Sequence, residues 1–140
     1  MLAHIVLAPK TAAKKVAAES MPSKKMRNID VKGVDVVKLG KLHAIVTGNK
    51  YDAVRKSYDL AAEGGEEGPW VVRLPDDFVA TIAAFDVSAA KRAWEAWAKT
   101  EEMKADKINV AAARLIVRAM CDMCRRAHGD DQALFLWTML

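Results

Sequence analysis

The apolar run that ends the chain restricts the fold more than any other segment. Residues 134–140 read Leu-Phe-Leu-Trp-Thr-Met-Leu, so only Thr138 is polar. A segment this apolar at an exposed sheet edge or a frayed chain end would pair with other chains, and it therefore has to be buried. The pattern predicts that residues 133–140 form a central strand of a sheet.

Two further segments are typical of strands, because short apolar runs at residues 2–8 and 70–74 are each closed by a proline. Between the strands, apolar residues recur every three or four positions, which favours amphipathic helices. The predicted helices span residues 11–20, 36–46, 51–62, 77–85, 89–103 and 110–127. The expected N-caps of the last five include Asp35, Asp76, Ser88 and Asn109.

These elements predict an α+β protein with five or six helices packed on a small sheet of about three short strands. An all-α fold is the alternative, if the terminal apolar runs extend helices instead. The length of 140 residues fits a single domain over residues 1–140, and no glycine- or serine-rich linker divides it. Residues 21–32 are polar, basic and weakly periodic, and we expect a mobile basic loop there.

The charge is unevenly distributed along the chain. Residues 1–60 carry 12 basic and 5 acidic side chains, whereas residues 61–140 carry 10 basic and 13 acidic ones. A basic half can bind nucleic acid or another anion, although it can equally be a set of solvated helix faces. The candidate phosphate contacts are Lys10, Lys14, Lys15, Lys24, Lys25 and Arg27. Residues 1–50 contain no aromatic side chain for base stacking.

A second candidate site is the pair Cys121 and Cys124 with His128. These side chains share one side of the predicted last helix, and thiolate and imidazole ligands both suit zinc. A structural zinc site usually needs four ligands, and Cys124 lies within the apolar stripe of the helix. Core packing with no cofactor is therefore the competing interpretation. A redox role fits poorly, because reactive Cys-x-x-Cys pairs normally begin a helix.

His43 is the one residue typical of acid–base chemistry within a helix. No nucleophile or pair of carboxylates stands at a spacing that joins it, so a buried, hydrogen-bonded histidine is the favoured interpretation. We identify no catalytic residue and expect no enzymatic activity. Trp94 and Trp97, about one helical turn apart, are expected to anchor the core.

Residues 42–48, Leu-His-Ala-Ile-Val-Thr-Gly, are similar to a piece of the YfbM-like domain of unknown function. Together with residues 68–75 and 134–137, they resemble small uncharacterised bacterial proteins. The resemblance implies a bacterial cytoplasmic protein and carries over no functional residue.

A chain with a full core and no convergent reactive groups favours a non-enzymatic interaction or accessory protein, such as an immunity-type or regulatory partner. The alternatives are a nucleic-acid-associated protein and a small metal-binding protein. The first residues lack the features of a signal peptide, and no apolar run approaches the ~20 residues that span a bilayer. We therefore expect a cytoplasmic protein with reduced cysteines, no membrane contact, and another protein or a second copy as its partner.

Overall fold

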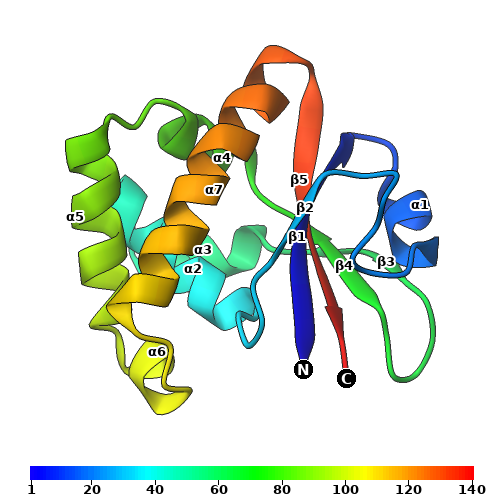
Figure 1. Cartoon of the computed structure of the whole chain (residues 1–140), viewed down its shortest axis with the longest axis horizontal. Coiled ribbons are helices and arrows are strands. Elements are labelled where there is room, and N and C mark those ends of the chain that lie inside the picture. Colours follow the sequence, from blue (N-terminus) through cyan, green and yellow to red (C-terminus); the bar gives the residue numbers. More distant parts are fainter.

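The structure is a computed structural model that describes residues 1–140, and it places seven α-helices against one five-stranded sheet (Figure 1). The strands are β1 (Leu2–Pro9), β2 (Asn28–Asp30), β3 (Leu60–Glu63), β4 (Trp70–Arg73) and β5 (Gln132–Met139). The helices are α1 (Ala13–Ala18), α2 (Val36–Thr47), α3 (Tyr51–Val54), α4 (Asp76–Ala83), α5 (Val87–Ala98), α6 (Glu101–Ala105) and α7 (Val110–Gly129), and a short 3₁₀ helix, η1 (Arg55–Ser57), follows α3. The α+β prediction is confirmed. The all-α alternative is wrong, because both terminal apolar runs are strands.

The sheet has the order β2-β1-β5-β4-β3, and every neighbouring pair is antiparallel. The last strand, β5, therefore lies in the middle, as its apolar sequence predicted. It pairs with β1 over the full length of both strands, from Leu2 opposite Met139 to Pro9 opposite Gln132. The first and last elements of the chain thus form the centre of the molecule.

Both faces of these central strands are buried. Helices α2 to α7 cover one face, and the short helix α1 lies on the other (Figure 1). Ile5 and Leu134 belong to the larger core cluster, whereas their neighbours Val6 and Phe135 belong to a smaller cluster on the α1 side. Because side chains alternate between faces along a strand, burial on both sides explains why β5 is apolar without alternation.

Two strands were not predicted, and both lie at the edges of the sheet. Strand β2 falls within residues 21–32, where we expected a loop. Strand β3 begins at Leu60, inside the helix expected at residues 51–62, and ends at Glu63. Edge strands are often short and polar, because an exposed apolar edge would pair with other chains. Their sequences, Asn-Ile-Asp and Leu-Ala-Ala-Glu, carry little of the apolar signal on which strand prediction depends.

Side-chain caps begin several helices. The carboxylate of Asp35 accepts a hydrogen bond from the Lys38 amide at 2.9 Å, and Asn109 caps α7 in the same way, as predicted. The prediction for Ser88 is wrong, since Asp86 caps α5 by accepting from the Ala89 amide at 2.7 Å. No helix of the protein has both the length and the apolar composition required to cross a membrane.

Two further differences from the predicted helices lie within residues 75–103. Asp76 lies inside the first turn of α4 rather than capping it, and Pro75 occupies the cap position. The helix expected at residues 89–103 is two helices, because Thr100 accepts from the Met103 amide and begins α6 after α5 has ended.

Candidate functional site

Helix α7 carries a stripe of three arginines and one cysteine on the side that lines a hollow with α5. Arg114, Arg118, Cys121 and Arg125 follow one another at spacings of four, three and four residues, which places them on one side of the helix. The adjacent side of α7, which includes Val117, is fully buried against the rest of the core. Helix α5 packs against α7 on the side away from the sheet (Figure 1).

Two adjoining hollows, of about 440 and 500 Å³, lie between these helices. They share Val87, Trp94 and Arg114, so we treat them as one depression and call it the α5–α7 groove. Trp94 is 9% exposed and forms part of the floor. The other residues that line the groove include Asp86, Lys91, Glu95, Val110, Arg118, Cys121 and Arg125.

The α7 wall of the groove carries two positive charges without carboxylate partners. Arg114 and Arg118 are exposed, and neither takes part in any ion pair of the protein. The guanidinium carbon of Arg114 lies 5.8 Å from the centroid of the Trp94 ring, within the range of a cation–π contact. The indole holds Arg114 at the groove without neutralising its charge.

Arg125 has a different role, because it is bound to the end of α4. Its guanidinium donates to the carbonyl oxygen of Phe85 at 2.7 Å and to that of Ala83 at 3.3 Å. A cation at the C-terminus of a helix complements the helix dipole and satisfies carbonyls left without a partner. Arg125 therefore fixes α7 against α4, and the charges free for a ligand are those of Arg114 and Arg118.

The α5 wall contributes apolar surface and charges that are already paired. Asp86 is used as the cap of α5, and Glu95 lies 3.8 Å from Lys91 on the same helix. Val87, at the start of α5, is 83% exposed, and Val110, at the start of α7, is 51% exposed. The groove therefore combines uncovered aliphatic side chains with unpaired arginines along the α7 wall.

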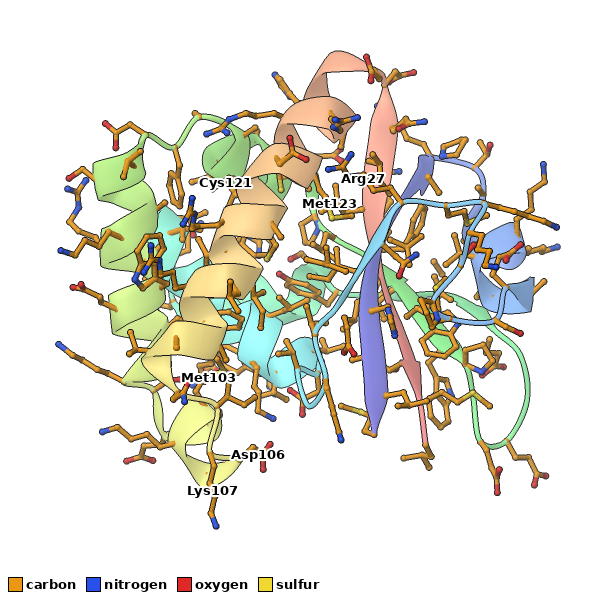
Figure 2. The ribbon with its side chains drawn as sticks, in the orientation of Figure 1. Arg27, Met103, Asp106, Lys107, Cys121 and Met123 are labelled. Atoms are coloured by element: carbon orange, nitrogen blue, oxygen red, sulfur yellow. The ribbon has the colours of Figure 1, made fainter.

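The cysteines predicted as metal ligands lie on α7 but do not join a group of ligands. Cys121 and Cys124 are both buried in the larger core cluster, whereas His128 is exposed in the last turn of α7. Cys121 also lines the groove, and Figure 2 shows its place on α7. Burial raises the pKa of the Cys121 thiol, and it raises the pKa of Cys124 to about 12. No three His, Cys, Asp or Glu side chains of the protein lie in a metal-binding arrangement. The zinc site stays a prediction without geometric support.

The six basic residues predicted as phosphate contacts are only partly brought together. Lys15, Lys25 and Arg27 line a hollow of about 450 Å³ between α1 and the ends of the central strands. Arg27 is bound to Asp122 on α7 at 2.6 Å (Figure 2). The other ion pairs in this group are Lys10 with Asp131 and, at 3.9 Å, Lys25 with Glu19. Lys14 and Lys24 are exposed and do not line the hollow.

His43 lies in a chain of hydrogen bonds that the spacing in the sequence did not indicate. Its Nε2 atom is 3.0 Å from a carboxylate oxygen of Asp77, and its Nδ1 atom is 3.0 Å from the hydroxyl of Tyr58. The imidazole is 1% exposed and stacks on Phe78 with the ring centroids 4.7 Å apart. The favoured interpretation, a buried and hydrogen-bonded histidine, agrees with this geometry.

The direction of these bonds follows from the chemistry of the two partners. An ionised Asp77 carboxylate only accepts, so Nε2 carries the proton and Nδ1 accepts from the Tyr58 hydroxyl. Burial, with a smaller contribution from the Asp77 charge, raises the pKa of Tyr58 well above its usual value, which keeps that hydroxyl protonated. None of the three side chains lines one of the larger hollows. The chain joins α2, the segment after η1 and α4, and we assign it a structural role.

The arginines of the groove were visible in the sequence only as flanking residues of the cysteine motif. Residues 61–140 carry more acidic than basic side chains. Their net negative charge therefore gave no indication of the positively charged surface that the groove arginines form. The signal that identifies it is the four-residue spacing of Arg114 and Arg118 on the side of α7 that also carries Arg125.

Comparison of the chain with protein families, with curated proteins and with solved structures gave no match. The resemblance of residues 42–48 to the YfbM-like domain therefore stays a prediction.

Proposed function

We propose that this is a non-enzymatic interaction protein of the cytoplasm, which binds a partner protein through the α5–α7 groove. The observation that carries the proposal is the pair of exposed arginines, Arg114 and Arg118, that no carboxylate of the chain neutralises. The two side chains lie on one face of α7, and the ten ion pairs of the protein leave both charges available for a partner.

The composition of the groove supports binding to a protein rather than a small molecule. Protein interfaces are enriched in arginine and aromatic residues and surround apolar anchors with polar side chains. Arg114 and Trp94 are in contact here, and Val87 exposes 83% of its surface beside them. A small-molecule site is normally more enclosed, whereas this groove is an open seam between two helices.

The proposal can be tested with two variants of equal charge. Arg114→Glu/Arg118→Glu reverses both charges of the groove, and Lys14→Glu/Lys24→Glu makes the same change in net charge around α1, on the other face of the sheet (Figure 1). The unaltered protein and both variants are purified from the native host and analysed by native mass spectrometry. A partner that accompanies the unaltered protein and the α1 variant, but not the groove variant, supports the proposal. Equal recovery by all three contradicts it.

A second candidate function, nucleic-acid association, is favoured by the hollow near α1. Lys15, Lys25 and Arg27 surround it, and basic side chains that neutralise phosphates make binding strongly dependent on salt. The test is binding to unrelated duplexes at 50 and 200 mM salt, with Lys15→Glu/Lys25→Glu as the variant. Binding that weakens steeply with salt and is lost in the variant supports this function, and no binding at 50 mM contradicts it.

A further inference from the structure

Resting on the function proposed above, we infer that the occupant of the α5–α7 groove is an acidic amphipathic helix of a partner protein, with carboxylates one turn apart facing Arg114 and Arg118. Three features of the groove favour such a helix: the spacing of the two arginines, the elements that form its walls, and its exposed aliphatic side chains.

The spacing favours a helix whose carboxylates recur at each turn. Arg114 and Arg118 are four residues apart on α7, which corresponds to a rise of about 6 Å along the axis. Carboxylates at positions i and i+4 of a second helix lying along α7 have the same separation. Each guanidinium has a planar fork of donors that binds a carboxylate with two hydrogen bonds.

The walls favour a helix over an extended segment. Both walls of the groove are α-helices, whose backbone amides and carbonyls are bonded within each helix away from its ends. An extended peptide gains affinity by adding a strand to a sheet edge, and the edge strands of this sheet do not line the groove. A helix satisfies its own backbone and packs its side chains into the seam between two others.

The apolar side chains of the groove favour a protein over a nucleic acid. The exposed side chains of Val87 and Val110 need aliphatic partners, and Trp94 is too deeply buried to stack on a base. An amphipathic helix offers apolar residues to the valines and carboxylates to the arginines.

The test places a photo-crosslinking amino acid at position 87, whose side chain is exposed at the groove. The full-length protein is crosslinked in its native host, with the same amino acid at the exposed position 14 as a control, and the crosslinked segment is identified by mass spectrometry. We expect a segment of a different protein with Asp or Glu at positions i and i+4. We also expect Arg114→Glu/Arg118→Glu to reduce the crosslink at least tenfold, with Lys14→Glu/Lys24→Glu leaving it unchanged.

The decisive step is a charge exchange. Lysine substitutions at the two acidic positions of the captured segment should restore the crosslink to the Arg114→Glu/Arg118→Glu variant. Four outcomes overturn the inference but leave binding at the groove intact. They are a captured segment without such acidic residues, a captured nucleic acid, a captured second copy of the chain, and a charge exchange that does not restore the crosslink. If position 87 gives no more crosslinking than position 14, the proposed function is overturned as well.

Discussion

The Nδ1 atom of His43 lies 3.0 Å from the hydroxyl oxygen of Tyr58, and this contact joins residues 15 positions apart in the sequence. The relationship matters because His43 is almost fully buried. A buried acceptor without its donor is destabilising by about 1–3 kcal/mol. Packing and hydrogen bonding thus account for the burial of the histidine in the Leu-His-Ala-Ile-Val-Thr-Gly segment.

We expect Tyr58→Phe to lower the free energy of unfolding by about 1–3 kcal/mol, because it removes the donor to His43 and leaves Nδ1 without a partner. Urea denaturation followed by circular dichroism measures the change. Tyr51→Phe is the matched control, since no hydrogen bond of the Tyr51 hydroxyl appears within the protein, and its effect should stay within about 0.5 kcal/mol. Equal effects of the two substitutions would contradict the assigned hydrogen bond.

Two buried tryptophans provide a second matched comparison. The indole nitrogen of Trp97 donates to the carbonyl oxygen of Lys38 at 2.9 Å, whereas the indole nitrogen of Trp137 is buried without an acceptor. Replacement by phenylalanine removes similar volumes, but it removes a satisfied donor from Trp97 and an unsatisfied one from Trp137. We therefore expect Trp97→Phe to destabilise the protein by about 1–3 kcal/mol more than Trp137→Phe in chemical denaturation. The reverse order would show that packing differences outweigh the hydrogen bond.

The cysteines should be nearly inert in the folded protein at pH 8. Because thiolate is the reactive form, raising the pKa of Cys124 from 9.0 to about 12 reduces its thiolate fraction ~1000-fold. Cys121 lines the groove and should react first. The measurement is the rate of reaction with a thiol reagent in Cys121→Ala and Cys124→Ala, in buffer and in urea. Full native reactivity at Cys124 would contradict its burial.

The ion pair of Lys10 with Asp131 gives stability a pH dependence at the acidic end. The hydrogen bond and charge of Lys10 lower the pKa of Asp131. The contribution is therefore present above the unfolded-state pKa and is lost as the pH falls through the lower folded-state value. Asp131→Asn keeps a residue that tolerates the positive φ of 54° at this position. Its melting temperature should lie below that of the unaltered protein at pH 6 and approach it near pH 2. A constant difference across this range would exclude the pair as the cause.

Removal of residues 134–140 should abolish folding. Strand β5 is the middle of the sheet and contributes Leu134, Leu136 and Trp137 to the two core clusters. Deletion of Leu140 alone, which is 74% exposed and follows the strand, is the control and should be tolerated. Heteronuclear NMR spectra of the two truncated proteins distinguish the outcomes. A cooperatively folded chain without residues 134–140 would show that the sheet can close without β5.

The sequence predicted best the features that one segment determines by itself. The apolar run of β5 required burial on both faces, and the side chains of Asp35 and Asn109 match the geometry of helix caps. Ser88 and Asp86 lie two residues apart and are both common caps, so the choice between them depends on where α4 ends. Strands β2 and β3 each pair with a single neighbouring strand, β1 and β4, and local composition does not reveal such a neighbour.

The candidate site was harder to predict, because it depends on which helices become neighbours. The side chains of Trp94 and Arg114 are 20 positions apart, and they meet only because α5 packs beside α7. The net charge of each half of the sequence predicted a phosphate-binding site among the N-terminal residues. In the structure, Lys10 and Arg27 have acidic partners on or beyond α7. Ion pairing between distant residues neutralises part of the predicted phosphate-contact set and leaves the arginines of the groove unpaired.

The pairing of β1 with β5 also has a consequence for synthesis on the ribosome. Strand β1 precedes its central partner, β5, by more than a hundred residues, so it leaves the ribosome well before β5. At about 5–20 residues per second, that interval lasts roughly 6 to 25 seconds. During this time, the backbone of β1 has no β5 with which to pair, and non-local pairing of this kind slows folding in general. Chaperone dependence and aggregation during translation should therefore be governed by β1 rather than by the helices that bear the binding groove.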